Sequence, residues 1–115
     1  MTQSHPHQFE IRVQQDGPAA RLHLTGELDV ACEEPFADTV KQCLAGGTTD
    51  MLVDLSELRF IDSSGLRMLI ELWDRSRNNG LQISILHGTG QVRRTMEIAG
   101  LDNLLPIADR GSSRR

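Results

Sequence analysis

A nearly unbroken apolar run, Met51-Leu52-Val53-Asp54-Leu55, lies between two turn-forming segments near the middle of this chain of 115 residues. A strand with one face in water alternates apolar and polar side chains. A run without that alternation is typical of a strand buried on both faces in a parallel sheet. Parallel strands need crossover connections, and these are usually helices. The run therefore predicts an α/β fold with this strand at its centre.

The N-terminal part of the chain predicts a β-hairpin. Apolar and polar residues alternate on both sides of the turn segment Asp16-Gly17-Pro18, as they do in two antiparallel strands joined by a tight turn. The alternating positions are Phe9, Ile11 and Val13 before the turn and Ala20, Leu22 and Leu24 after it. One face of this hairpin is therefore expected to be buried.

Three amphipathic segments predict helices between the remaining strands. The first follows Glu33-Glu34-Pro35 and ends at Gly46-Gly47, the second carries Leu66, Leu69, Ile70 and Trp73 on one face and stops at Asn78-Asn79-Gly80, and the third lies between Thr89 and Gly100. Alternation over Leu81–Ile85 and a short apolar segment, Leu104–Ile107, predict two more strands. The expected order is β-β-α-β-α-β-α-β, in a mixed and mostly parallel sheet that begins with the hairpin.

Length and composition limit the class of protein. We expect a single domain over residues 8–108, a disordered N-terminus over residues 1–7 and a flexible C-terminal tail over residues 109–115. The N-terminus has neither the basic start nor the apolar segment of a secretory signal, which predicts a cytoplasmic protein without a membrane partner. A net charge of −4, with scattered basic residues, argues against direct nucleic-acid binding. Cys32 and Cys43 are expected to be structural thiols.

The most informative stretch is LVDLSELRFIDSSGL, from Leu52 to Leu66. It takes a buried strand through a loop to Asp62-Ser63-Ser64-Gly65 at the start of a helix. The N-terminus of a helix presents unpaired N–H groups and a positive dipole end, so the domain would tolerate a phosphate there. Asp and Ser are also favoured N-caps, so capping alone is an equal alternative on local sequence. Gly65, which lacks a Cβ, is expected to let a partner approach the serines closely.

Three motifs together resemble the STAS family, the sulfate transporter and anti-sigma factor antagonist domain. They are GELD at Gly26–Asp29, VDLSELRFIDSSGLRML at Val53–Leu69 and MEIAGL at Met96–Leu101. The resemblance implies a STAS-like fold and an anti-sigma factor antagonist, a binding protein and not an enzyme. It implies that Ser63, directly after the aspartate, is phosphorylated by an anti-sigma factor serine kinase, and that phosphorylation ends the capture of that kinase.

The resemblance also implies the partners and the contact residues. The kinase would bring ATP and magnesium, a serine phosphatase would reset the switch, and the chain itself would need no cofactor or metal. Expected partner contacts are Asp29, Asp62, Ser63, Ser64 and Gly65. Asp62 has capping as an equal alternative, and Ser64 is expected to be a second cap or a contact and not the main acceptor. A loop aspartate such as Asp29 is more often local structure.

Other functions fit the sequence less well. A receiver domain would use Asp54 as phosphoacceptor, but such domains need an acidic pair after the first strand and a lysine after the last, and Lys41 is the only lysine. A hydrolase would need a G-x-S-x-G elbow, which the serines lack. No catalytic or metal role is expected for the histidines, which are His5, His7, His23 and His87. Within the family, the alternative is an accessory subunit of a lipid-transport ABC system or a stress-sensing scaffold.

Overall fold

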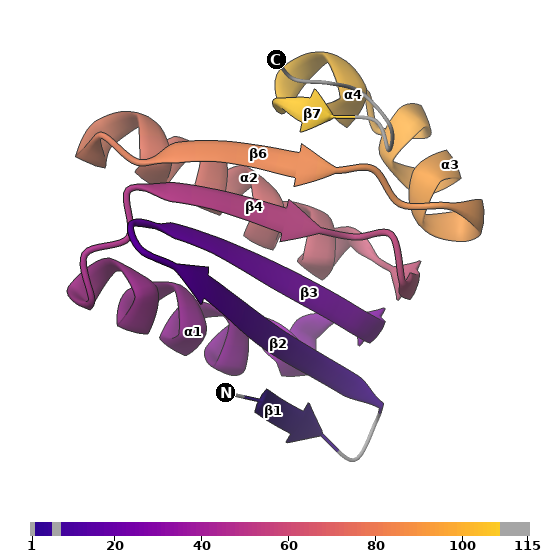
Figure 1. Cartoon of the computed structure of the whole chain (residues 1–115). Coiled ribbons are helices and arrows are strands. Elements are labelled where there is room, and N and C mark those ends of the chain that lie inside the picture. Colours follow the sequence, from indigo (N-terminus) through magenta and orange to yellow (C-terminus); the bar gives the residue numbers. More distant parts are fainter. Residues whose placement is uncertain (1, 6–7, 109–115) are drawn as a thin grey trace.

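Figure 1 shows the fold as a computed structural model, which describes the backbone of residues 2–5 and all of residues 8–108. The strands are β1 (Thr2–His5), β2 (Phe9–Asp16), β3 (Ala19–Leu28), β4 (Asp50–Asp54), β5 (Leu58–Ile61), β6 (Gln82–Leu86) and β7 (Ile107–Ala108). The helices are the 3₁₀ turn η1 (Val30–Cys32), α1 (Glu33–Ala45), α2 (Ser63–Asn79), α3 (Gly90–Ile98) and α4 (Leu101–Leu104).

All seven strands form one mixed sheet in the order β1-β2-β3-β4-β6-β7, and β5 pairs separately with β3. The pairs β1·β2 and β2·β3 are antiparallel. Every later pair is parallel. This arrangement confirms the predicted α/β class, the initial hairpin and the mostly parallel sheet.

The hairpin between β2 and β3 turns where the sequence predicted. Asp16 pairs with Ala19, so Gly17 and Pro18 form a two-residue connection. Gly17 has a φ of 60°, the left-handed conformation that the first position of a primed hairpin turn requires. Both strands continue further than the alternation indicated, and β3 reaches Leu28, at the edge of the candidate site.

The central position of β4 is also confirmed, since it lies between β3 and β6. Helices α1 and α2 cover one face of the sheet (Figure 1). On that side Met51 and Val53 are buried, in a core whose fully buried residues also include Leu22, Leu24, Leu69 and Ile85. Leu52, on the opposite face, is only half-buried. The expected burial on both faces is therefore partial.

Several elements differ from the sequence expectation. Thr2–His5 forms β1, paired with β2, within the segment expected to be disordered. β5 lies inside what was expected to be a loop, and α4 lies in the segment before the last strand. That strand is Ile107–Ala108 and not Leu104–Ile107. The expected C-terminal tail, like residues 1, 6 and 7, lies outside the described residues.

Candidate functional site

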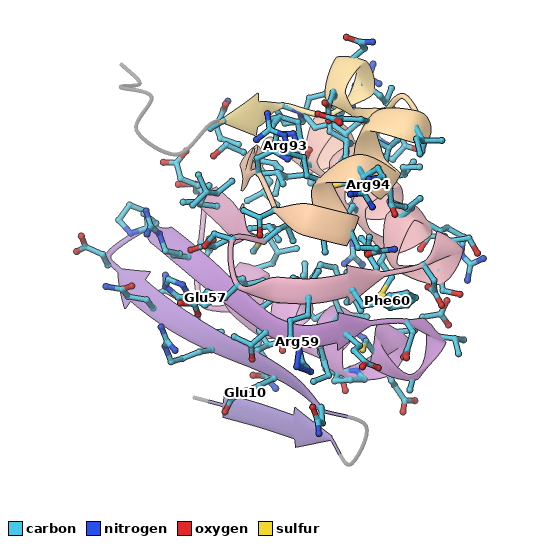
Figure 2. All side chains as sticks on the ribbon, turned by 90° about the vertical axis from the view of Figure 1, so that its right-hand side faces the viewer. Glu10, Glu57, Arg59, Phe60, Arg93 and Arg94 are labelled. Atoms are coloured by element: carbon cyan, nitrogen blue, oxygen red, sulfur yellow. The ribbon has the colours of Figure 1, made fainter. Side chains whose placement is uncertain are left out.

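Strand β5 carries the chain from the central strand to the predicted site. It runs parallel to the end of β3, where Glu27 pairs with Phe60 and Leu28 pairs with Ile61. The backbone N–H of Asp62 then donates to the carbonyl of Leu28 at 3.4 Å. These contacts place the start of α2 beside the end of β3, on the side of the molecule that Figure 2 faces.

Asp62 is the N-cap of α2. Its backbone is extended, and its Oδ1 accepts the N–H groups of Ser64 at 3.0 Å and Gly65 at 3.1 Å. These donors are among the N–H groups that every helix start leaves unpaired. Capping, one of the two roles expected for Asp62, is therefore present in the structure. The other expected role, orienting Ser63 toward a kinase, stays a prediction.

Ser63 is the first residue of α2 and is exposed, whereas Ser64 is half-buried. The acceptor of the capping hydrogen bonds is the Asp62 carboxylate and not the Ser63 hydroxyl. The hydroxyl of Ser63 therefore stands at the positive end of a helix of 17 residues while another side chain does the capping.

Gly65 does not border an open space that a partner could enter. It is buried, and a Cβ at this position would lie 2.6 Å from Cγ1 of Ile61 and 2.6 Å from the carbonyl oxygen of Leu28. The missing side chain therefore lets α2 pack closely on β3 and β5 of its own domain. The expectation that it opens space for a partner is corrected, because that space is already filled.

Asp29 has a local structural role. Its side chain accepts the N–H of Ala31 at 3.1 Å and caps η1, and it is half-buried. The turn η1 in turn packs against α2. Asp29 thus stabilises the turn that packs against α2, the helix that begins at Ser63. A contact between Asp29 and a partner stays a prediction.

Sequence reasoning missed Gln91, which fastens α3 to the end of β5. Its Oε1 accepts the N–H of Ile61 at 3.0 Å, and its Nε2 donates to the carbonyl of Ile61 at 3.0 Å. The side chain therefore acts as one more strand partner directly before Asp62. No local signal marks it, because its partner lies far away in the sequence.

Asp54 is engaged within its own domain. Its Oδ1 accepts the N–H of Ser56 at 2.9 Å and the hydroxyl of Ser56 at 2.6 Å, and its Oδ2 lies 3.1 Å from Nδ1 of His23. Burial alone raises the pKa of Asp54, but the Ser56 hydrogen bonds and the His23 charge outweigh it and the net pKa is lowered. The arrangement is a structural clasp between β3 and β4.

The two cysteines are free and buried. Burial raises the pKa of the Cys32 thiol to about 11 and also raises that of Cys43. Both groups therefore stay protonated near neutral pH, which fits their expected role as structural thiols.

Among the described residues, no helix is both long and apolar enough to cross a membrane.

A protein-family model described as "Mlab, STAS domain" matches residues 11–106. The chain belongs to the STAS domain family. A STAS-domain containing protein of Pseudomonas aeruginosa is 28% identical to this STAS domain over 93 residues, which are 81% of this chain and 91% of that protein. The anti-sigma-B factor antagonist of Staphylococcus aureus is 28% identical over 82 residues, which are 71% of this chain and 76% of that protein.

The solved structures that resemble this STAS domain include an anti-sigma factor antagonist in two states. Unphosphorylated SpoIIAA has a TM-score of 0.72 at 19% identity, over 90% of this chain and 99% of that one. Phosphorylated SpoIIAA of Bacillus has a TM-score of 0.67 at 19% identity, over 86% of this chain and 89% of that one. At this identity the likeness establishes the fold, which agrees with the family match.

The capping role of Asp62 predicts the effect of its removal. Asp62→Ala is expected to lower the free energy of unfolding by about 1 kcal/mol, because two N–H groups at the start of α2 lose their acceptor. Asp62→Ser keeps an acceptor and is the matched control. Urea unfolding of the three proteins measures the difference. Equal loss in both variants would contradict the capping role.

The lowered pKa of Asp54 predicts a dependence of stability on pH. The unfolded carboxyl titrates near pH 3.9 and the folded one below it, so the ionised group stabilises the fold above about pH 4. That contribution is lost as the pH falls through the folded pKa. The free energy of unfolding of wild type, measured in urea, is therefore expected to fall more steeply below about pH 4 than that of Asp54→Asn. Identical pH slopes would contradict the clasp.

Proposed function

We propose that this STAS domain is an anti-sigma factor antagonist, which binds an anti-sigma factor serine kinase through the surface around Ser63 and loses that binding when Ser63 is phosphorylated. One observation carries the proposal. Ser63 is exposed at the first residue of α2, while Asp62 makes the capping hydrogen bonds that Ser63 would otherwise be needed for.

Two exposed apolar side chains lie on elements that pack against α2, the helix that begins at Ser63. Val30, in the turn that packs against α2, is 62% exposed, and Phe60 of β5 is 39% exposed. Figure 2 labels Phe60 together with Arg59 of the same strand and Arg94 of α3, which packs against β5. Aromatic and arginine side chains around an apolar centre are typical of protein interfaces. We call Val30, Phe60, Ser63 and Ser64 the Ser63 surface.

Phosphorylation would act on this surface by charge. The Ser63 oxygen would bond to the γ-phosphorus of ATP held by the kinase with magnesium, the bond from that phosphorus to ADP would break, and the hydroxyl proton would pass to a base of the kinase. The product carries about −1.5 to −2 charges at pH 7. The helix N-terminus tolerates that charge within the domain, whereas a closely packed partner would have to desolvate it. The antagonist names of relatives and the phosphorylated state of SpoIIAA support this proposal.

Capture and phosphorylation test the proposal. The purified domain is immobilised on a resin and incubated with native lysate of its own organism. The protein that the resin retains is identified by mass spectrometry. We expect a serine kinase of the anti-sigma type. Incubation with that kinase, ATP and Mg²⁺ should then add one phosphate, located on Ser63, and none to Ser63→Ala. Phosphate on Ser64 alone, or equal labelling of both proteins, would assign the switch to another residue.

A second candidate is an accessory subunit of a lipid-transport ABC system. The matching family model is described as Mlab and not as an antagonist, and the Pseudomonas relative carries only the general name of the domain. Such a subunit needs a docking surface but no modified serine. Capture of an ABC ATPase, without phosphorylation of Ser63, would favour this function over the antagonist.

A further inference from the structure

Three side chains that commonly bind metal ions meet near the end of β6. His87 directly follows that strand, Glu97 lies in the last turn of α3, and Asp102 lies in α4. One ligand atom from each, a ring nitrogen or a carboxylate oxygen, can be chosen so that all three lie within 4.8 Å of one another. Three separate elements therefore bring their ligand atoms to one place.

The imidazole of His87 is buried there without a hydrogen bond. Its side chain is 6% exposed, and neither Nδ1 nor Nε2 has a hydrogen-bond partner among the described residues. Oδ1 of Asp102, which faces Nε2, is also inaccessible to solvent and without a hydrogen-bond partner among the described residues, while the Asp102 side chain as a whole is 34% exposed. Buried polar atoms are nearly always paired, because leaving them unpaired costs free energy. A ligand between Nε2 of His87 and Oδ1 of Asp102 would satisfy these two atoms.

The spacing of the two atoms fits a shared ion. Nε2 of His87 lies 3.4 Å from Oδ1 of Asp102. Two ligands at about 2.0–2.1 Å from a tetrahedral Zn²⁺ lie about 3.3–3.4 Å apart. Glu97, whose side chain is 49% exposed, would have to leave its present ion pair and rotate to join the other two ligands. It now pairs with Arg93, whose Nε lies 3.2 Å from its Oε2.

We propose that His87, Glu97 and Asp102 bind one divalent transition-metal ion, Zn²⁺ by the type of its ligands, with water in the fourth position. A neutral imidazole and two carboxylates balance the charge of the ion. Imidazole suits zinc and its neighbours in the transition series, whereas Mg²⁺ and Ca²⁺ prefer oxygen ligands alone. The sequence predicted no metal role for His87. The three ligands follow no spacing in the sequence that marks them as a site.

A bound ion would tie the segment after β6 to both C-terminal helices. Helix α3 also holds the end of β5 through the two hydrogen bonds between Gln91 and Ile61. The ion would therefore stabilise the part of the domain that supports the Ser63 loop. It stands apart from the phosphorylation chemistry, so the two proposals fail or succeed separately.

Titration of the metal into chelator-treated full-length protein tests the site. ZnCl₂ is added at pH 7 and followed by calorimetry, with thermal unfolding in parallel. We expect one ion per chain and, at about 100 times the dissociation constant, a rise in melting temperature of roughly 5–10 °C. Absence of saturable binding would overturn the proposal.

Variants test whether the ion binds to these three residues and not to other metal-binding side chains of the chain. Glu97→Gln, at an exposed position that should not disturb folding, is expected to weaken binding at least tenfold, and so is Asp102→Asn. Arg93→Gln should bind more tightly than wild type, because it frees Glu97 and removes a positive charge. The double variant His5→Gln/His7→Gln is the matched control and should bind like wild type. Binding that is lost in this control, or unchanged in Glu97→Gln, would overturn the assignment.

Discussion

Ser63→Asp is expected to weaken binding of the anti-sigma kinase at least tenfold, or about 1.4 kcal/mol, and full phosphorylation should weaken it about a hundredfold, or about 2.8 kcal/mol. The added charge would face a partner at a surface that also carries Val30 and Phe60. Ser63→Ala adds no charge and cannot be phosphorylated. It should bind the kinase constitutively and leave transcription by the released sigma factor on.

Stability separates this prediction from simple capping. Because the Asp62 carboxylate caps α2, both Ser63 variants should unfold within about 1 kcal/mol of wild type. An aspartate in the first turn also suits the helix dipole, so Ser63→Asp should fold at least as well as Ser63→Ala. If the hydroxyl were needed as a cap, the alanine variant would be the damaged one and the aspartate variant would behave like wild type.

Ser64→Asp is the matched control for position. Ser64 is the next residue and is half-buried, while Ser63 is exposed. Affinities of the three variants and wild type for the purified kinase, measured by calorimetry with unfolding curves for each, make the comparison. Wild-type affinity of Ser63→Asp, together with a loss in Ser64→Asp, would move the switch to Ser64.

The parts of the fold predicted from sequence are those fixed by contacts close in the chain. The turn at Gly17 and the cap at Asp62 each involve residues only two or three positions apart. Their signals therefore survive in the local sequence. The central position of β4 was predicted from the nearly unbroken apolar run, although burial on the face of Leu52 is only partial.

The parts that were missed depend on partners far away in the sequence. Strand β5 forms because Phe60 and Ile61 pair with the end of β3. Its sequence does not alternate apolar and polar residues as a half-buried strand does, so nothing local marks it as a strand. Gln91 is held by hydrogen bonds to Ile61, which lies 30 positions earlier in the sequence. The wrong prediction of open space at Gly65 has the same cause, because the residue that fills this space, Leu28 of β3, is distant in the sequence.

The packing of Gly65 predicts a large loss of stability from the smallest substitution. In Gly65→Ala the added methyl would lie 2.6 Å from both the Leu28 carbonyl oxygen and Cγ1 of Ile61. Real contacts of this kind are much longer, so α2 would have to move off the sheet. Overpacking of a core typically costs about 1–3 kcal/mol, and a backbone oxygen cannot rotate away. We expect about 3 kcal/mol for alanine and more for Gly65→Val.

Helix propensity makes this prediction sharp, because it acts in the opposite direction. Alanine is favoured over glycine within a helix by about 1 kcal/mol, so an unobstructed Gly65→Ala would be stabilising. Gly46→Ala is the matched control, since its methyl would lie 3.4 Å from the nearest atom, an ordinary contact. Urea unfolding should show Gly46→Ala near wild type and Gly65→Ala well below it. A Gly65→Ala protein with wild-type stability but weakened kinase binding would restore the glycine to the partner interface.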